Sequence, residues 1–228
     1  MSEYLFATEE RISLPINGTD LRFPVRRVLC VGQNYAAHAR EMGADPQRRP
    51  PFFFSKPADA LAPLGGEIPY PSRTTDLHHE VELVVAIGHG GVDLDSESAA
   101  DLIIGWAVGV DLTRRDLQAE AKATGRPWDA AKGFDFSAPI GPITLRRELK
   151  HPSGVIQLAV NGQTRQTGFL SDMIWSPADV VAQASSLWRL APGDLIFTGT
   201  PEGVGPLHRG DRITAQIDGL TGLEFTVL

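Results

Sequence analysis

The sequence has almost no cysteine and no long apolar segment. Its single cysteine, Cys30, has no partner for an internal disulfide, which fits a reducing cytoplasm. No charged and then apolar leader opens the chain, and no apolar run approaches the ~18 residues that a membrane-spanning helix needs. We therefore expect a cytoplasmic protein without a membrane partner.

Basic residues are fewer than acidic ones, and several common motifs are absent. The formal net charge is -7, from 21 Lys and Arg against 28 Asp and Glu, and no basic stripe is present, so nucleic acid is not an expected partner. The absence of Gly-x-Ser-x-Gly argues against a serine hydrolase. Without a Gly-Lys-Ser/Thr pattern, the glycine-rich stretch 199–205 is a poor phosphate loop.

Glycine and proline, by contrast, are plentiful, with 23 and 17 residues among 228. They separate many short apolar runs, as expected for a protein built from short strands. The predicted strands outnumber the helices and do not alternate with them as parallel βαβ units would. The sequence therefore predicts one mostly-β (α+β) domain over residues 1–228, in which residues 1–24 form a small N-terminal β appendage.

Local patterns place the individual elements. Strands are expected over 4–7, 11–16, 28–31, 52–57, 77–88, 104–110, 156–160, 164–167, 195–198, 211–217 and 224–228, with Asn161-Gly162 as a hairpin turn. Helices are expected over 34–42 with Asn34 as N-cap, over 98–103, from a capping box at Thr113 and Asp116 to about 123, and from Ser176-Pro177 onward. The stretches 44–51, 63–75 and 126–140 are expected to be loops.

The segment 77–88 combines an apolar strand with two carboxylates. Side chains on a strand alternate between faces, so Glu80 and Glu82 point the same way, roughly 6–7 Å apart along the strand. Converging to ~5 Å at an effective dielectric near 20, they would repel by about 3 kcal/mol. Either one is protonated, or basic side chains surround them, or a cation lies between them. We favour the cation, with Asp111 at the end of the next strand as a third ligand, and oxygen ligands of this kind suit Mg²⁺ or Mn²⁺ better than Zn²⁺. The ordinary alternative is a solvent-exposed or salt-bridged face.

Two further pairs fall at helical spacing. His38 and Glu41 share a face, and a histidine oriented by a carboxylate can activate water as a general base. Arg115 and Gln118 follow Asp111 in the same way, and a guanidinium can bind a substrate carboxylate in bidentate fashion. Without other information, a surface ion pair and a solvated helix face explain the same spacing.

Three single residues complete the candidates. Lys132, among aromatic residues in an expected loop, could stabilise an enolate or a carboxylate. Lys56, at the end of an aromatic strand, could contact substrate or cover apolar surface with its stem. The hydroxyl of Thr200 and its neighbouring amides could receive a carboxylate. His78 and His79 are interpreted as supporting or core histidines and not as ligands.

Taken together and in this order, these segments resemble the fumarylacetoacetate hydrolase family over roughly residues 25–228. The matching stretches are Cys30-Val31-Gly32-Gln33-Asn34-Tyr35 with His38 and Glu41, Phe54-Ser55-Lys56-Pro57, His78-His79-Glu80-Val81-Glu82, Gly109-Val110-Asp111-Leu112-Thr113 with Arg115, Asp116 and Gln118, Trp128 and Lys132, Val160-Asn161-Gly162, and Gly199-Thr200-Pro201-Glu202-Gly203-Val204-Gly205. One departure is Gln33, where many members have Arg. The helix of His38 resembles the acylpyruvase branch of the family.

This resemblance implies a mixed β-sandwich roll, usually a homodimer, acting on a small-molecule dioxo acid. It implies Mg²⁺ or Mn²⁺ at Glu80, Glu82 and Asp111, and a water-activating His38–Glu41 pair on a segment that orders over bound substrate. It further implies that Lys132 stabilises enolate charge and that substrate contacts come from Arg115, Gln118, Lys56 and Thr200.

The reaction expected from this set is metal-dependent hydrolysis of a carbon–carbon bond in a 2,4-dioxo acid (an acylpyruvate), with fumarylpyruvate of aromatic (gentisate) catabolism as the first candidate. Decarboxylation of oxaloacetate and isomerisation of unsaturated dioxo acids remain alternatives because they use the same metal and enolate stabilisation. A metal-dependent binding protein without turnover is a further alternative, against which the His–Glu pair argues.

Overall fold

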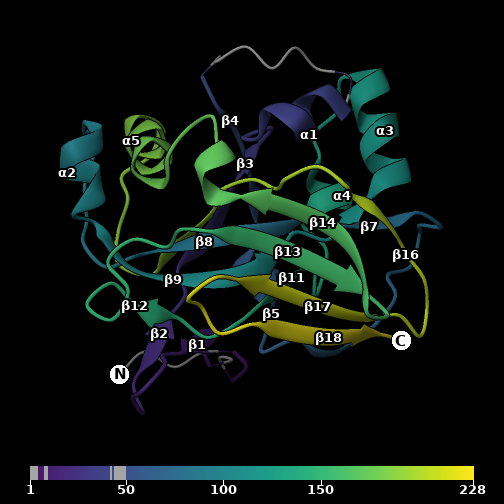
Figure 1. Ribbon diagram of the computed structural model, residues 1–228, viewed down its shortest axis with the longest axis horizontal. Coiled ribbons are helices and arrows are strands. Elements are labelled where there is room, and N and C mark those ends of the chain that lie inside the picture. Colours follow the sequence, from purple (N-terminus) through teal and green to yellow (C-terminus); the bar gives the residue numbers. More distant parts are fainter. Residues whose placement is uncertain (1–4, 8–9, 42, 44–49) are drawn as a thin grey trace.

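The computed structural model describes residues 5–7, 10–41, 43 and 50–228 (Figure 1). The predicted strand 4–7 is wrong for residues 5–7, the part of it that is described, because these residues form no strand. Most of the predicted loop 44–51 lies outside the described residues. None of the described helices is long and apolar enough to cross a membrane.

A large sheet and a smaller one form the body of the molecule. The large sheet has the order β4 (Phe52–Lys56), β3 (Arg27–Gly32), β15 (Asp194–Phe197), β8 (Val81–Ile87), β9 (Ile103–Val110), β11 (Ala138–Ile140) and β5 (Leu61–Pro63), with β12 (Thr144–Leu145) also paired to β9. The smaller sheet has the order β14 (Gln163–Phe169), β13 (Val155–Val160), β17 (Arg212–Ile217), β18 (Leu223–Val227) and β6 (Gly66–Ile68). Both mix parallel and antiparallel pairs, as the predicted mixed β fold requires.

Two minor sheets and the helices surround this body. The minor sheets are β10 (Thr113–Arg114), β7 (Leu77–His79) and β16 (Gly205–Leu207), and β1 (Ser13–Pro15) with β2 (Arg22–Pro24). The helices are α1 (Ala36–Glu41), α2 (Ser96–Ala100), α3 (Arg115–Thr124), α4 (Asp129–Lys132) and α5 (Pro177–Leu187), with 3-10 turns at Ala58–Ala60 and Leu170–Asp172. Figure 1 shows α2 and α5 together at one end and α1, α3 and α4 at the other.

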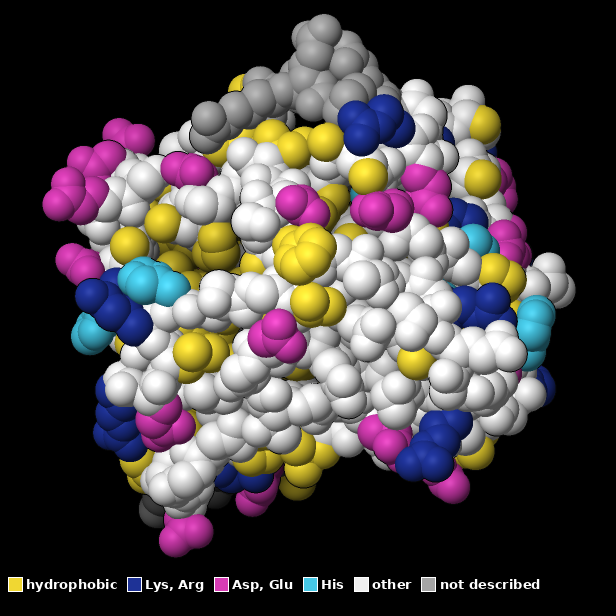
Figure 2. Space-filling view, in the orientation of Figure 1, with side chains coloured by type: hydrophobic (Ala, Val, Ile, Leu, Met, Phe, Trp, Pro, Cys, Tyr) yellow, Lys and Arg dark blue, Asp and Glu magenta, His cyan; other side chains and the backbone are white. Residues whose placement is uncertain are grey.

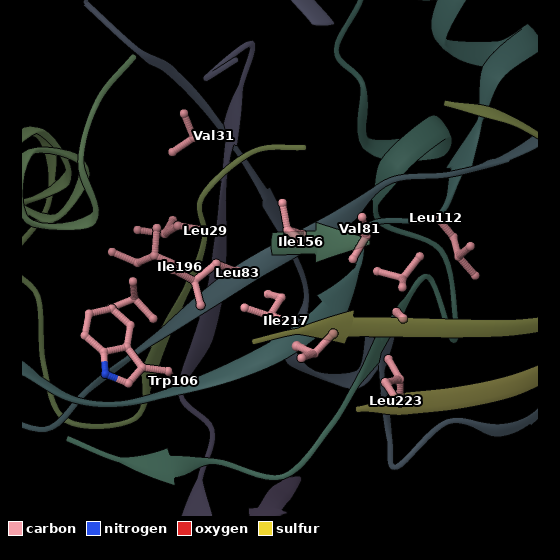
Figure 3. Packing of buried hydrophobic residues seen from close by; sticks show 14 of the residues in the cluster. Leu29, Val31, Val81, Leu83, Trp106, Leu112, Ile156, Ile196, Ile217 and Leu223 are labelled. Atoms are coloured by element: carbon pink, nitrogen blue, oxygen red, sulfur yellow. The ribbon is translucent and has the colours of Figure 1, made fainter. Parts of the chain in front are cut away.

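Strand β8 lies at the centre because both of its faces are apolar. Val81, Leu83 and Val85 share one face, as predicted, and pack in the core that includes Ile156 and Ile217 of the smaller sheet (Figure 3). The opposite face belongs to a second core with the appendage strands β1 and β2. At about 25 cal/mol per Å² of apolar surface, burial of this kind is the main stabilising contribution. Glu82 therefore lies in a strand whose position is fixed by packing on both sides.

Other local predictions had mixed outcomes. The Asn161-Gly162 hairpin is confirmed, with φ of 52° and 76° at the turn, and Ser176 caps α5 together with Asp179. The predicted capping box at Thr113 is wrong: Thr113 lies in β10, and α3 begins without a side-chain cap. Helix α2 begins earlier than predicted, capped by Asp95.

Two predictions within the site region are also corrected. The single strand 77–88 is broken at Glu80, because β7 pairs in a minor sheet whereas β8 belongs to the large sheet. The stretch 126–140 is not simply a loop, since it contains α4 and β11.

On the face shown in Figure 2, lysine and arginine side chains are interspersed with acidic ones.

Candidate active site

The three predicted carboxylates meet because β8 and β9 pair antiparallel. Val81 lies opposite Val110, and the Asp111 amide donates to the Glu80 carbonyl at 2.8 Å. Glu80 and Asp111 are therefore cross-strand neighbours, and Glu82 is one pleat farther along. All three are buried, and one ligand atom from each lies within 4.8 Å of the others. This set of hard oxygen donors could hold a Mg²⁺ or Mn²⁺ ion.

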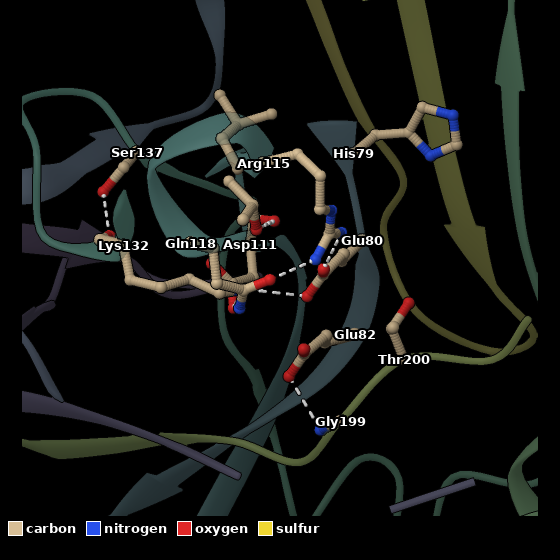
Figure 4. A network of polar contacts seen from close by, with 12 residues as sticks. His79, Glu80, Glu82, Asp111, Arg115, Gln118, Lys132, Ser137, Gly199 and Thr200 are labelled. Atoms are coloured by element: carbon tan, nitrogen blue, oxygen red, sulfur yellow. Dashed lines mark hydrogen bonds and ion pairs between the residues drawn. The ribbon is translucent and has the colours of Figure 1, made fainter. Parts of the chain in front are cut away.

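Two cationic side chains hold Glu80 (Figure 4). Lys132, the last residue of α4, places Nζ 2.8 Å from Glu80 Oε2 and 2.7 Å from Asp111 Oδ2. Arg115, the first residue of α3, donates to Glu80 Oε1 and, at 2.6 Å, to Gln118 Oε1. Lys132 is only 2% exposed, so it is not a solvent-exposed lysine.

Lys56 holds Asp111 from the other side. Its buried ammonium group lies 2.8 Å from Asp111 Oδ1 and also donates to the carbonyls of Leu112, Lys132 and Ser137. Lys56 is 1% exposed and does not line the cavity described below. Its geometry is that of a residue that orients Asp111, whereas direct contact with a substrate stays a prediction.

The pKa values of Glu80 and Glu82 are shifted in opposite directions. Burial raises the pKa of Glu80, but Lys132 and Arg115 outweigh it, so the pKa falls below its usual value and the group is ionised. Burial, Asp111 and Glu80 raise the pKa of Glu82 well above its usual value, opposed mainly by a hydrogen bond of 2.7 Å from the Gly199 amide. Glu82 is thus the carboxylate whose charge a bound cation would stabilise most, which fits a metal ion among the three.

The predicted His–Glu pair lies beside this cluster. Nδ1 of His38 is 3.2 Å from Glu41 Oε2, and the Gly203 amide donates to the same carboxylate at 3.1 Å. Asn34, predicted as the cap of α1, instead donates to the carbonyls of Trp175 and Thr198 and accepts from the Trp175 amide. The chain before α1 is thereby fixed both to Trp175, just before α5, and to the loop that follows β15.

One cavity joins these groups. Its lining includes seven of the predicted site residues. The lining residues are Val31, Gly32, Gln33, His38, Phe52, Phe54, Glu80, Glu82, Arg115, Gln118, Lys122, Trp128, Lys132 and Thr200. The candidate base His38, two of the three candidate metal ligands, and Arg115, Lys132 and Thr200 therefore face the same space.

Sequence reasoning missed two residues here. Lys122 lines the cavity from α3, and its spacing of four residues from Gln118 and seven from Arg115 could have revealed it. Gln166 is fully buried and bonds to Thr200 Oγ1, the carbonyl of Pro201 and the Val81 amide. No local pattern distinguishes it from the other polar residues of β14. His79, interpreted as a supporting histidine, contacts Gln166 at 2.9 Å.

Comparisons with known proteins agree with this geometry. The model of the fumarylacetoacetate (FAA) hydrolase C-terminal family matches residues 27–228. The crystal structure of fumarylpyruvate hydrolase from Pseudomonas aeruginosa in complex with Mn²⁺ and pyruvate is 52% identical, covers 99% of both chains and superposes with a TM-score of 0.97.

Two curated relatives have different names. A fumarylpyruvate hydrolase of Ralstonia sp is 41% identical over 77% of this chain and 92% of its own length. A mitochondrial oxaloacetate tautomerase of Arabidopsis thaliana is 44% identical over 88% of this chain and 90% of its own. With a family model that spans almost the whole sequence and a solved structure of the same fold at this identity, the chain belongs to the fumarylacetoacetate hydrolase family.

Proposed function

We propose that this protein hydrolyses a carbon–carbon bond in a 2,4-dioxo acid with the help of Mg²⁺ or Mn²⁺, and that fumarylpyruvate is its substrate, giving fumarate and pyruvate. The observation that carries the proposal is that one cavity unites the carboxylates of a candidate metal site with a His–Glu pair able to take a proton from water. The fumarylpyruvate hydrolases of Pseudomonas aeruginosa and Ralstonia sp described above support this choice of substrate. A homodimer and a cytoplasmic location stay predictions.

The charges of the site suit an anionic substrate. Three carboxylates, Glu80, Glu82 and Asp111, are accompanied by three cationic side chains, Lys56, Arg115 and Lys132. The cluster is therefore close to neutral by itself, and a divalent cation would leave it positive. A metal ion held by Glu80, Glu82 and Asp111 would supply Lewis-acid polarisation of the substrate's 2-oxo group.

The protein's own groups account for the proton transfers. Because the Glu41 carboxylate accepts from Nδ1, His38 carries its proton on that nitrogen, and Nε2 is free to take a proton from water. The resulting hydroxide adds to the distal carbonyl, and the bond between that carbon and the methylene carbon breaks. The electron pair stays with the pyruvate unit as an enolate, which takes up a proton to give pyruvate. The charged ammonium group of Lys132 stabilises the enolate as it develops.

A second candidate is tautomerisation of oxaloacetate, which is favoured by the 44% identical relative named for it. This reaction also forms an enolate but needs no attacking water. A tautomerase retains every carbon of its substrate, whereas a hydrolase divides it, so the products distinguish the two. Decarboxylation, the other alternative, would release carbon dioxide from oxaloacetate.

The test is purified protein assayed with Mg²⁺ or Mn²⁺ on fumarylpyruvate and on oxaloacetate, with all products identified. We expect fumarate and pyruvate, and a loss of about 10²- to 10⁴-fold in hydrolysis for His38→Ala. His89→Ala, an exposed histidine outside the cavity, is the matched control. Hydrolysis that persists unchanged in His38→Ala, or activity on oxaloacetate alone, would refute the proposal.

A further inference from the structure

Gln166 uses every hydrogen-bonding atom of its side-chain amide. Oε1 lies 3.0 Å from the Val81 amide nitrogen and 2.9 Å from His79 Nδ1. Nε2 lies 2.8 Å from Thr200 Oγ1 and 2.9 Å from the Pro201 carbonyl. The side chain comes from β14 of the smaller sheet, and it bridges the start of β8 to the loop after β15.

Two backbone groups fix the orientation of this amide. The Val81 amide can only donate, so the atom facing it must be the oxygen of Gln166, and the Pro201 carbonyl can only accept, so the atom facing it must be the nitrogen. The orientation is therefore settled without reference to Thr200. His79 must then donate from Nδ1.

This orientation determines what the Thr200 hydroxyl can do. Since Nε2 of Gln166 is a donor, Thr200 Oγ1 accepts, and its single hydrogen remains available. Within the part of the chain that the structure describes, that hydrogen has no acceptor, although Thr200 is only 2% exposed. Thr200 lines the cavity together with His38, Glu80 and Glu82.

The loop that contains Thr200 also donates hydrogen bonds to a candidate metal ligand and to the carboxylate partner of the candidate base. The Gly199 amide donates to Glu82, and the Gly203 amide donates to Glu41. Gly199 has φ of 97°, and a Cβ at this position would lie 2.7 Å from Asn34 Cβ, so the loop passes where only glycine fits. A shift of Thr200 and Pro201 would therefore reach the candidate metal ligands and the base.

We propose that Gln166 is a positioning residue that keeps the Thr200 hydroxyl as a hydrogen-bond donor to a carboxylate oxygen of the bound substrate. Gln166 does not line the cavity and acts only through Thr200. The inference rests on the proposed function, since it assumes that an α-oxo carboxylate occupies the cavity.

Two variants of Gln166 separate this role from general support of the fold. Gln166→Glu keeps an acceptor for Val81 and His79, but its ionised carboxylate attracts the Thr200 hydroxyl hydrogen, which then turns away from the cavity. Gln166→Met removes the amide altogether. With Mn²⁺ present, we expect Gln166→Glu to bind pyruvate about tenfold more weakly in calorimetry, and to raise KM more than it lowers kcat.

A double-mutant cycle with Thr200→Val tests whether Gln166 acts through the Thr200 hydroxyl. Without the hydroxyl, Gln166→Glu or Gln166→Met should weaken pyruvate binding no further, whereas in Thr200→Ser, which retains a hydroxyl, the loss should reappear. Additive losses in the Thr200→Val background would overturn the proposal, because they would show that Gln166 acts on the site as a whole. Melting temperatures of all variants establish that each is folded.

Failure of the proposed function gives a different result: the wild-type protein then forms no fumarate and pyruvate from fumarylpyruvate, whereas pyruvate binding with Mn²⁺ still tests the role of Gln166. If no α-oxo carboxylate occupies the cavity at all, the wild-type protein with Mn²⁺ binds neither pyruvate nor oxalate. The link between the two side chains is then read from the NMR signals of the Gln166 amide protons. Thr200→Val should shift these signals because it removes their acceptor, and unchanged signals would overturn the inference.

Discussion

The two sides of the carboxylate cluster differ in what holds them. On the cationic side, Glu80 and Asp111 bond to charged groups, and Lys132 bridges the two. On the loop side, Glu82 is bonded to the Gly199 amide, and among the described residues no cationic side chain pairs with it. The pKa of Glu80 is accordingly lowered, whereas that of Glu82 is raised first by burial and then by its acidic neighbours.

This difference assigns distinct tasks to the two sides. The cationic side is already compensated by protein charges, so it can form when the chain folds. The loop side carries a buried carboxylate that gains stability when a divalent cation arrives. Metal binding should therefore stabilise this protein mainly through Glu82.

The largest expected effect comes from exchanging one glutamate on each side for glutamine. Glu82→Gln and Glu80→Gln should each lower metal-dependent turnover by at least about 10³-fold, because each removes a candidate ligand from a metal-dependent reaction. Their stabilities without metal should diverge. Glu82→Gln should be neutral or stabilising, whereas Glu80→Gln leaves Arg115 and Lys132 with a weaker acceptor and should cost about 1–3 kcal/mol.

Thermal unfolding in a chelator and again with Mn²⁺ measures this divergence. The wild-type protein should gain stability from Mn²⁺, and both variants should gain much less. If the two variants lose equal stability in the chelator, the contrast between the two sides is incorrect.

Whether a feature of the site could be predicted from the sequence depends on how far apart along the chain the interacting residues lie. Glu80, Glu82 and the face shared by Val81 and Leu83 follow from strand alternation, which is local. The break at Glu80 does not, because it depends on the pairing of β7 with β10 and β16, which come from later parts of the chain.

Burial of charged side chains was equally hard to foresee. In sequence, Lys56 resembles any lysine that ends a strand, and its complete burial depends on Asp111 and carbonyls far along the chain. The role of Gln166 could not be predicted for the same reason, since its partners Val81 and Thr200 come from two other strands or loops. The family resemblance supplied the order of motifs, whereas these contacts required the three-dimensional structure.

A smaller effect tests how far the cationic side extends along α3. Lys122 lines the cavity, its Nζ lies 5.1 Å from the centre of the Trp128 ring, and it has no carboxylate partner among the described residues. It lies about 10 Å along the helix axis from Arg115, a separation comparable to the length of an extended seven-carbon diacid. Lys122→Met should raise KM about tenfold for fumarylpyruvate and leave acylpyruvates with an uncharged distal end unaffected.

The controls for this prediction are Lys122→Arg, which keeps the charge, and Lys150→Met, which removes an exposed lysine outside the cavity. An equal change in KM for charged and uncharged substrates would show that Lys122 does not recognise the distal carboxylate. The cationic side would then extend along α3 no farther than Gln118.

The smallest expected effect concerns the attachment of α3 itself. Asp116 does not form the predicted capping box with Thr113, and instead accepts hydrogen bonds from Thr74 Oγ1 at 2.7 Å and from the Thr75 amide at 3.1 Å. Burial raises the pKa of Asp116, but these hydrogen bonds outweigh it and keep the pKa below its usual 3.8. Asp116→Asn should therefore lower the free energy of unfolding by about 1 kcal/mol at neutral pH.

The sign of the pH dependence follows from the lowered pKa. A carboxylate whose pKa is lower in the folded state stabilises the protein above its unfolded pKa, and this contribution disappears as the pH falls through the folded pKa. The difference between wild type and Asp116→Asn should thus be complete at pH 7 and shrink below about pH 4. Asp135→Asn, which removes an exposed carboxylate in the loop after α4, should change the free energy of unfolding little at pH 7. A constant difference between wild type and Asp116→Asn down to pH 3 would mean that the shape of the side chain, and not its charge, attaches α3 and the cationic side to the residues before β7.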